Sequence, residues 1–344
     1  MTNLQACISK YTEAQIIENI AVKAGIGDHV LLEVYQSPKS TVDQNTLFDM
    51  ASVTKIIVTT TAALIALDRK LFSLDDFVHQ YISCPPDKSG MTIRHLLTHT
   101  MGIGYRDLRG DGVNYENVAS YILNIPNNIP IGQDVQYSCP GFILLGKILE
   151  KVFGARLDRI LRSEITEPLQ MTSTSFLPDR KTAIANHNLA EHTAGIVNDN
   201  NCRFLGGISG NAGIFSNMHD MTLFAKFLLQ YGSPLIQKET FQFAMANHTP
   251  GMSGARGLGF LYVDERYAQT GSLFPVGSFG HCGHTGQSLF VDPVSGLYAI
   301  ILSDATVATK KKYGAERYQE VMTMRKDLHN AILNDLNIMN RSPL

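Results

Sequence analysis

Residues 48–55 have the sequence Phe48-Asp49-Met50-Ala51-Ser52-Val53-Thr54-Lys55, which places a serine and a lysine three positions apart. Because positions i and i+3 share a face of a helix, the hydroxyl of Ser52 and the amine of Lys55 can meet there. A serine becomes a strong nucleophile only when a base takes its proton, and a partly desolvated lysine can be that base. The same spacing also fits a helix-capping serine followed by an exposed lysine, so the motif needs support from the rest of the chain.

The segments around this motif have patterns of regular secondary structure. From Ser52 to about Arg69 the chain is rich in Ala, Leu and Ile, which predicts a buried helix despite three consecutive threonines. Residues 30–35 have the length and composition of a strand. Residues 12–15 have the pattern of a capping box, and the apolar residues that follow up to Ala21 have helical spacing, so we expect a short helix there.

The remaining segments predict helices in the middle of the chain and strands near its end. Residues 73–76 have the acidic residues of a first helical turn, and the chain to about residue 190 has mostly helical patterns. Residues 288–291 and 297–302 have strand composition and flank a turn-rich linker, and residues 318–336 predict a terminal helix. This order predicts an α+β fold whose sheet joins both ends of the chain.

Four further motifs follow the first in sequence order. They are T-I-R-H-L-L-T-H-T-M-G at 92–102, Tyr137-Ser138-Cys139 before F-I-L-L-G at 142–146, G-N-A-G-I-F-S at 210–216, and G-H-C-G-H-T-G at 280–286. Together the five motifs resemble the serine β-lactamase and penicillin-binding-protein superfamily, specifically its class C β-lactamase-like branch of esterases, D-peptidases and acyltransferases. The resemblance extends from about Phe48 to Asp304.

The resemblance implies a β-lactamase/transpeptidase-like fold, in which an antiparallel sheet flanked by helices is joined to a mostly helical subdomain. The whole chain, 1–344, would then be a single catalytic domain. Its α+β subdomain would comprise about 1–65 and 195–344, and its helical subdomain about 66–194.

The resemblance also implies roles for individual residues of the catalytic set. Ser52 would be the nucleophile that forms an acyl-enzyme, and Lys55 its proton acceptor. Tyr137 would be the second member of the base system, with Lys55 and His281 as the cationic neighbours that a tyrosine needs in order to ionise near neutral pH. The backbone N–H groups of Ser52 and His284 would form the oxyanion hole.

The third motif of the family has two possible registers in this chain. The tripeptide His281-Cys282-Gly283 fits better, because Gly280 precedes it and Asp292-Pro293 follows at the expected distance. His284-Thr285-Gly286 is the literal His-Thr-Gly sequence and is the alternative.

Two cysteines occupy positions where the family usually has other polar residues. Cys139 stands in place of Asn or Asp in the second motif, and Cys282 stands in place of Thr in the third. With Gly283, these cysteines are expected to line the substrate pocket. Because a thiol is a weak hydrogen-bonding group, the replacements weaken the case for β-lactam hydrolysis and for a peptidoglycan carboxypeptidase.

The two thiols allow two interpretations: neutral replacements in an esterase-like pocket, or convergence into a redox switch or metal site. Two thiols fall short of a structural zinc ligand set, and the five cysteines contain no CxxC pair, so the sequence predicts no metal and no cofactor. His187, Glu191 and His192 do not match a zinc-protease motif. His95 and His99 are expected to be structural.

The expected function follows from these residues. An imidazole at His281 is only fractionally charged near neutral pH and would attract a substrate carboxylate weakly, which favours a small uncharged ester or amide. We therefore predict an esterase-like serine hydrolase that forms a Ser52 acyl-enzyme. One alternative is an acyltransferase or a D-stereospecific peptidase or amidase on the same scaffold. Another is a catalytically silent binding protein that kept Ser52, Lys55 and Tyr137.

The composition argues against other classes of partner. The formal net charge is −2, from 29 Lys and Arg against 31 Asp and Glu, which argues against nucleic acid. The cluster Lys310-Lys311-Lys312 is expected to be a solvated turn. No signal segment is recognisable and no apolar stretch reaches the ~20 residues of a membrane span, so we expect no membrane association and a cytoplasmic location. The expected partner is a small-molecule ester, amide or acyl donor, and the sequence does not determine the oligomeric state.

Overall fold

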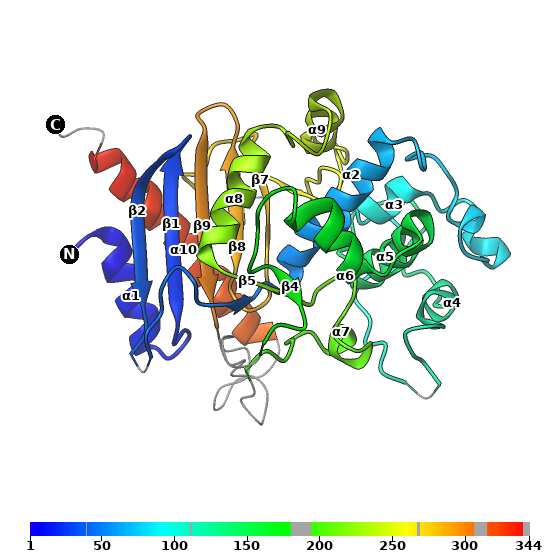
Figure 1. Ribbon diagram of the computed structural model, residues 1–344, viewed down its shortest axis with the longest axis horizontal. Coiled ribbons are helices and arrows are strands. Elements are labelled where there is room, and N and C mark those ends of the chain that lie inside the picture. The colour runs from blue at the N-terminus through cyan, green and yellow to red at the C-terminus, as the bar shows by residue number, and fades with distance from the viewer. Residues whose placement is uncertain (39, 111, 180–193, 267–268, 306–314, 340–344) are drawn as a thin grey trace.

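The computed structural model describes residues 1–344 with the exception of 39, 111, 180–193, 267–268, 306–314 and 340–344. Its centre is a six-stranded antiparallel sheet with the strand order β2-β1-β9-β8-β7-β6 (Figure 1). Two strands come from the start of the chain and four from its last third, so the sheet joins both chain ends, as the sequence predicts. The strands are β1 (Ile20–Ile26), β2 (His29–Gln36), β6 (Leu261–Tyr262), β7 (Phe279–Cys282), β8 (Ser288–Asp292) and β9 (Leu297–Ser303).

Helices cover both faces of this sheet. On one face α1 (Asn3–Glu13) lies beside α10 (Ala315–Met339), and α8 (Met218–Leu229) lies on the other face (Figure 1). The carboxylate of Asp335 on α10 accepts hydrogen bonds from the backbone N–H groups of Asn3 and Leu4, each at 2.9 Å. It thereby supplies acceptors to the first turn of α1, whose N–H groups have no partner within the helix. The two ends of the chain are therefore joined by helix contacts as well as by strand pairing.

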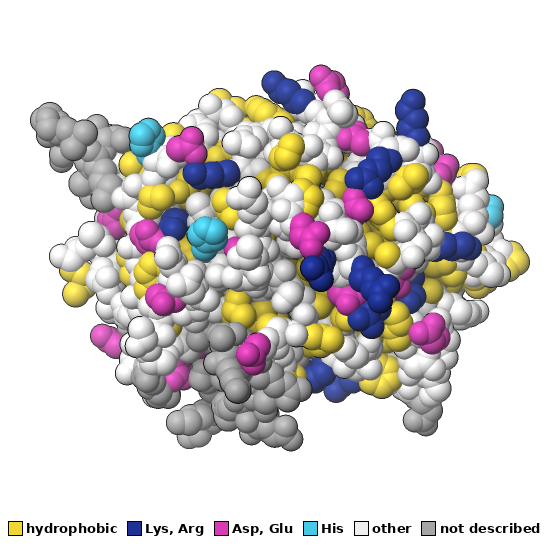
Figure 2. All heavy atoms as spheres, in the orientation of Figure 1, with side chains coloured by type: hydrophobic (Ala, Val, Ile, Leu, Met, Phe, Trp, Pro, Cys, Tyr) yellow, Lys and Arg dark blue, Asp and Glu magenta, His cyan; other side chains and the backbone are white. Residues whose placement is uncertain are grey.

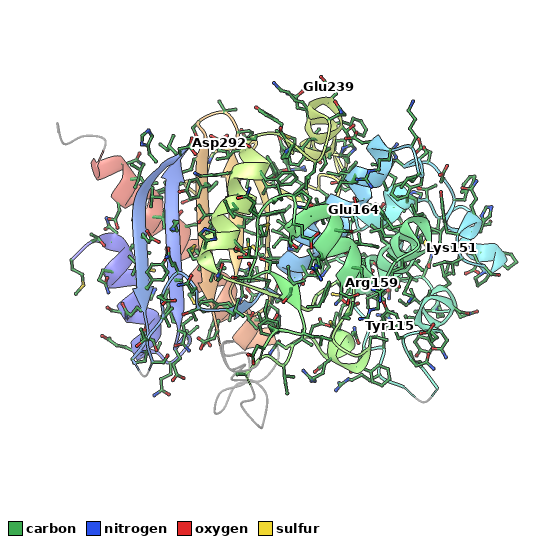
Figure 3. All side chains as sticks on the ribbon, in the orientation of Figure 1. Tyr115, Lys151, Arg159, Glu164, Glu239 and Asp292 are labelled. Atoms are coloured by element: carbon green, nitrogen blue, oxygen red, sulfur yellow. The ribbon has the colours of Figure 1, made fainter. Side chains whose placement is uncertain are left out.

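The hairpin of β8 and β9 is confirmed. Its turn contains Asp292 (Figure 3), whose carboxylate accepts hydrogen bonds from the backbone N–H groups of Val294 and Ser295, each at 3.1 Å. Side chains that hydrogen-bond to the backbone two or three residues ahead are typical of tight turns. The turn sets the register in which Ser288 pairs with Ile301.

The remaining elements form the side of the molecule away from α1 and α10 (Figure 1). A small sheet has the order β3-β5-β4, with β3 (Phe48–Asp49), β5 (Ile214–Ser216) and β4 (Ser175–Phe176). The helices are α2 (Thr61–Asp68), α3 (Ile93–Leu97), α4 (Val118–Leu123), α5 (Cys139–Phe153), α6 (Leu157–Ile160), α7 (Asn200–Phe204) and α9 (Lys238–Met245). Helices predominate in the described part of 66–194, as expected, and the exact subdomain boundaries stay a prediction.

The apolar segment that follows the first motif passes through the core. It begins as a 3₁₀ turn at Ala51–Val53, continues as a π-helical stretch at Lys55–Thr60 and ends as α2. Within the described residues, Ala51–Asp68 is the one helical window long and apolar enough to cross a membrane, and 83% of it is buried inside the protein. Beyond α2, Arg69 donates a hydrogen bond of 2.6 Å to Glu164, which Figure 3 labels. The predicted buried helix is confirmed.

The short helix predicted after residue 12 is wrong. α1 ends at Glu13, Gln15 adopts a φ of +56°, and the chain to Ala21 leads into β1. The hydroxyl of Thr12 donates to the carbonyl oxygen of Ile8, so this threonine belongs to the last turn of α1 and does not cap a new helix. A cluster of apolar residues as short as this one fits a helix face and a buried strand equally well.

The helix predicted at residues 73–76 is also wrong. The carboxylate of Asp76 accepts a hydrogen bond from the backbone N–H of Ser73 at 2.8 Å, as in a helix cap. No helix follows, because Phe77 pairs with Thr92 in an isolated β-bridge and the chain then forms a 3₁₀ turn at Val78–Gln80. The tertiary pairing therefore overrides a correct local capping signal.

Lys and Arg side chains are interspersed with Asp and Glu on the face shown in Figure 2. This mixture agrees with the formal net charge of −2. Lys310-Lys311-Lys312 lies outside the described residues, and the absence of a nucleic-acid partner stays a prediction.

Candidate active site

Ser52 lies in the 3₁₀ turn that directly follows β3. The preceding residue, Ala51, has a φ of +45°, in a region that residues other than glycine rarely occupy. The carboxylate of Asp49 accepts a hydrogen bond from the backbone N–H of Ala51 at 2.8 Å and another from that of Asn198 at 2.6 Å. Asp49 therefore ties the strained turn to a neighbouring segment, and the turn presents Ser52.

The structure brings Ser52, Lys55 and Tyr137 together. Lys55 Nζ donates a hydrogen bond to Ser52 Oγ at 3.0 Å, and the hydroxyl of Tyr137 donates to the same oxygen at 2.8 Å. Ser52 and Lys55 are neighbours through the helical spacing of the first motif. Tyr137 comes from the segment just before α5, 85 residues further along the chain. A hydroxyl in contact with two groups that can take up and return a proton has the arrangement of an activated nucleophile.

Lys55 is fully buried. Its Nζ also donates to the carbonyl oxygen of Asn211 at 2.8 Å and lies 3.7 Å from the Sγ of Cys139. The rings of Tyr137 and Phe142 lie 5.0 and 5.6 Å from Nζ. Burial lowers the pKa of Lys55, because a charged ammonium loses its hydration there. The lysine can therefore act as a neutral base toward Ser52.

Tyr137 is partly exposed, and its hydroxyl is directed at Ser52. Desolvation raises the pKa of Tyr137 well above its ordinary value, and the nearby Arg256 opposes that rise. The guanidinium carbon of Arg256 lies 5.8 Å from the centre of the Tyr137 ring. In the resting site Tyr137 is therefore a neutral phenol that donates to the serine oxygen.

His281 lies on β7, buried, with its ring centre 6.3 Å from that of Tyr137. Burial lowers the pKa of His281 well below its ordinary value, and the charges of Lys55 and Arg256 lower it further. The expectation of a cationic His281 is therefore wrong, because a buried imidazole is neutral at physiological pH. Its Nδ1 donates to the carbonyl oxygen of Cys282 at 2.8 Å, which leaves Nε2 as an acceptor. Within the described part of the chain, Nε2 has no hydrogen-bond partner.

The first register of the third motif faces the candidate site. His281 lies on β7 opposite Tyr137, whereas the side chain of His284 is exposed and stacks on Tyr318 at 5.7 Å. Gly283 packs so tightly against the turn before Ser52 that a Cβ at this position would lie 3.0 Å from the carbonyl oxygen of Met50. Residues 283–284 are thus adjacent to residues 50–52. The oxyanion hole formed by the N–H groups of Ser52 and His284 stays a prediction.

The two cysteines of the motifs do not share a pocket. Cys139 is buried at the start of α5 beside Lys55. Cys282 follows His281 on the same strand, so its side chain lies on the opposite face of the sheet. There its Sγ lies 3.9 Å from the hydroxyl of Ser288, and the residue packs against the core beneath α1 and α10. The expectation that the Cys282 side chain lines the substrate pocket is therefore wrong.

The other candidate ligands do not form a metal site among the described residues. No group of three or more His, Cys, Asp or Glu side chains in that part of the chain is arranged to hold a metal ion. His187, Glu191 and His192 lie outside the described residues. Burial raises the pKa of Cys139, which makes its thiol a poor metal ligand in this state.

The two histidines expected to be structural have structural contacts. His95 Nδ1 accepts a hydrogen bond from the backbone N–H of Thr92 at 3.0 Å and caps α3. His99 Nδ1 accepts one from the backbone N–H of Ser138 at 3.0 Å, and its ring packs against those of Tyr137 and Phe142 at 4.7 and 4.9 Å. His99 therefore fixes the segment that carries Tyr137.

The sequence did not indicate two residues that contact the site. Asn211 supplies the carbonyl oxygen that binds Lys55, and it lies inside the fourth motif, where only the pattern was recognised. Arg256 is buried beside Tyr137 in a segment that contains Gly254, Gly257 and Gly259. The closely spaced glycines around Arg256 were the one signal in the sequence that could have indicated its place in the site. Glycines allow backbone segments to approach one another closely, so this segment could be expected to pack tightly against its neighbours.

Comparisons with known proteins show the family of the chain. A family model described as Beta-lactamase matches residues 4–322. A protein of Escherichia coli O157:H7, named "Putative D-alanyl-D-alanine carboxypeptidase", is 29% identical over 302 residues, which cover 75% of this chain and 69% of that protein.

Two solved structures have the same fold. EstCE1, described as a hydrolase with promiscuous acyltransferase activity, superposes with a TM-score of 0.77 at 20% identity over 96% of this chain and 97% of that one. A class C beta lactamase from Rhodobacter sphaeroides superposes with a TM-score of 0.74 at 16% identity over 96% of this chain and 99% of that one. At these identities the likeness concerns the fold alone.

Proposed function

Because the chain belongs to the beta-lactamase family and is a hydrolase of the serine β-lactamase and penicillin-binding-protein type, we propose that it cleaves small uncharged esters or amides through a Ser52 acyl-enzyme. The observation that carries the proposal is the double contact of Ser52 Oγ, with Lys55 Nζ at 3.0 Å and the Tyr137 hydroxyl at 2.8 Å. The same contact argues against a catalytically silent binding protein, since such a protein has no need to keep this geometry.

The proposed reaction begins with Lys55 as a neutral amine. It takes the proton of Ser52 while Oγ attacks the carbonyl carbon of the substrate, and the backbone N–H groups of Ser52 and His284 bind the oxyanion. The proton then passes through Tyr137 to the alkoxide or amine, the ester or amide bond breaks, and the acyl group stays on Ser52. Water then attacks the acyl carbon and gives a proton to the same groups. The bond between Ser52 Oγ and the acyl carbon breaks, the proton returns to Oγ, and the carboxylic acid leaves the regenerated serine.

The preference for an uncharged ester rests on Cys139 and His281. The thiol of Cys139 occupies the place beside Lys55 where an amide would donate strong hydrogen bonds to an amide substrate. The buried His281 is neutral and offers no charge to a substrate carboxylate. Both features favour an ester over a peptide or a carboxylate-bearing β-lactam.

Acyl transfer and D-peptide hydrolysis are the second candidate function. EstCE1 is described as having acyltransferase activity, and the Escherichia coli relative carries a D-alanyl-D-alanine carboxypeptidase name. In acyl transfer an alcohol or amine would replace water as the attacking group.

Five free cysteines support the proposal that the enzyme works in the reducing cytoplasm.

A fluorophosphonate probe tests the acyl-enzyme. We expect covalent labelling of the wild type and none of Ser52→Ala. Ser209→Ala, a matched change at a buried serine that directly precedes the fourth motif, should keep the label. A folded wild type that is not labelled would contradict the proposal.

Substrate comparison tests the preference. We expect turnover of p-nitrophenyl butyrate to exceed that of a chromogenic cephalosporin and of D-alanyl-D-alanine peptides. Faster turnover of the cephalosporin or the peptides would overturn the preference for esters and favour the corresponding alternative.

A further inference from the structure

Arg256 is a buried arginine whose backbone is fixed from several directions. Its N–H donates to the hydroxyl of Thr249 at 3.0 Å, and its carbonyl oxygen accepts from the N–H of His248 at 2.6 Å. The next residue, Gly257, lies so close to Ala244 that a Cβ there would be 2.6 Å from that carbonyl oxygen. From this fixed backbone the side chain reaches the active site, where its guanidinium carbon lies 5.8 Å from the centre of the Tyr137 ring.

Charged and titratable groups reach Tyr137 and Lys55 from several elements. They are Cys139 on α5, His99 after α3, Asp199 before α7, Arg256 before β6, His281 on β7 and Tyr318 on α10. Burial lowers the pKa of both His99 and His281 well below the ordinary value, so these imidazoles are neutral. Burial raises the pKa of the Cys139 thiol, which is therefore neutral as well. Asp199 acts on Lys55 as an anion and favours its protonated form.

The guanidinium of Arg256 is the cation of this group that does not titrate, because arginine stays protonated at every pH at which the protein is folded. When Lys55 gives up its proton, Arg256 keeps its positive charge beside Tyr137. Its field opposes protonation of Lys55 and of His281, and it opposes the rise in the pKa of Tyr137. All three effects favour the unprotonated form of the group concerned.

We infer that Arg256 is a positioning residue of the active site, a fixed positive charge that keeps Lys55 available as a proton acceptor and stabilises the negative charge that develops on the Tyr137 oxygen when the tyrosine passes its proton on. In this role it takes the place that the resemblance to the family assigned to a charged residue on β7, where this chain has a neutral His281. The inference rests on the proposed function, because the reaction that needs these proton transfers is the attack of Ser52. It does not require contact between Arg256 and the substrate.

The test is the pH dependence of kcat/KM for p-nitrophenyl butyrate. The guanidinium carbon of Arg256 and Nζ of Lys55 lie 5.8 and 5.0 Å from the centre of the same Tyr137 ring, so the two charges are at most about 11 Å apart. Removing a unit charge at that distance changes a pKa by about 0.5 to 1 unit at an effective dielectric constant of about 20 to 40, and by more at a shorter distance. In Arg256→Met we expect the acidic limb of the pH profile to move to higher pH by at least that amount, because the protonated form of Lys55 is no longer destabilised. Arg256→Lys, which keeps the charge, is expected to return the limb to its wild-type position.

The matched control is Arg325→Met, which removes another buried arginine, on α10. It should leave the limb at the wild-type pH. If Arg256→Met does not fold, Arg256→Gln supplies an uncharged side chain that can still form hydrogen bonds. The inference would be overturned if the folded uncharged variant had a lower kcat/KM but an acidic limb at the wild-type pH. It would also be overturned if Arg325→Met moved the acidic limb as far as the Arg256 variant does.

The proposed function and the proposed role of Arg256 are contradicted by different results. A wild type that neither hydrolyses esters nor reacts with a fluorophosphonate contradicts the proposed function. An active wild type whose acidic limb is insensitive to the charge at 256 contradicts only the role of Arg256.

Discussion

The carboxylate of Asp49 accepts the backbone N–H of Ala51 at 2.8 Å, and Ala51 adopts a φ of +45° immediately before Ser52. A non-glycine residue in this region stores conformational strain of about 1–3 kcal/mol. Asp49 holds the turn in the one conformation that directs Ser52 toward Lys55.

We predict that Ala51→Gly raises the free energy of unfolding by about 0.5–1 kcal/mol, because glycine adopts a positive φ without a Cβ clash. Urea denaturation followed by circular dichroism measures the change. The companion variant Asp49→Ala should lose most esterase activity, since it frees the turn. If Ala51→Gly is destabilising by more than 1 kcal/mol, the turn is not strained as described.

Lys55→Met should remove the base while keeping a long side chain in the core. Loss of a general base lowers rates by about 10²–10⁴-fold, and we expect a fall of that size in kcat for p-nitrophenyl butyrate. The melting temperature should stay at or above that of the wild type, because an amine no longer has to be buried. Activity within tenfold of the wild type in Lys55→Met would exclude lysine as the proton acceptor.

Cys139→Asn should shift the substrate range toward amides, because an amide beside Lys55 restores a donor and an acceptor that the thiol provides only weakly. The measurement is the ratio of kcat/KM values for an anilide and an ester with the same acyl group. Cys282→Asn is the matched control on the opposite face of β7 and should leave this ratio unchanged. Identical ratios in the wild type and in Cys139→Asn would place the thiol outside the substrate pocket.

The burial of the His329 imidazole leads us to predict that the protein loses stability in acid. It is buried on α10, where Nε2 bonds Ser288 Oγ at 2.7 Å, and burial lowers its pKa from 6.5 to about 3. Between these two values the unfolded chain binds a proton that the folded chain does not, so the free energy of unfolding falls as the pH drops from about 6.5 toward 3. The maximum slope for one such group is about 1.4 kcal/mol per pH unit.

We expect His329→Gln to reduce this slope by about one group's share between pH 6 and 4.5, as measured by urea denaturation. His79→Gln, at an exposed histidine, is the control and should retain the wild-type slope. An unchanged slope in His329→Gln would mean that His329 is accessible to protons in the folded protein.

The sequence predicted the elements whose signals are local. The strands near residues 30–35 and 288–302, the long apolar segment after Ser52 and the terminal helix each fill one continuous pattern, and all are present. The segment after Thr12 failed because its few apolar residues suit either a strand or a helix. Residues 73–76 failed because Thr92, a distant residue, decided the local structure.

The same distinction between local signals and tertiary packing applies to the candidate site. Ser52 and Lys55 meet because of their spacing, and motif order placed Tyr137 beside them. The charge of His281 depends on burial, which a sequence does not display. Arg256 reaches Tyr137 only through the packing of loops that are far apart in the chain.

The sheet that joins both chain ends has a consequence for the order in which this protein can fold. β1 is paired on one side with β2 and on the other with β9, which ends at Ser303. A two-stranded hairpin is at best marginally stable in water, so β1 and β2 lack a lasting partner until most of the chain has been synthesised. The ribosome must therefore have synthesised the chain through β9 before the central sheet can form, and the pairing of β1 with β9 is a long-range step in folding.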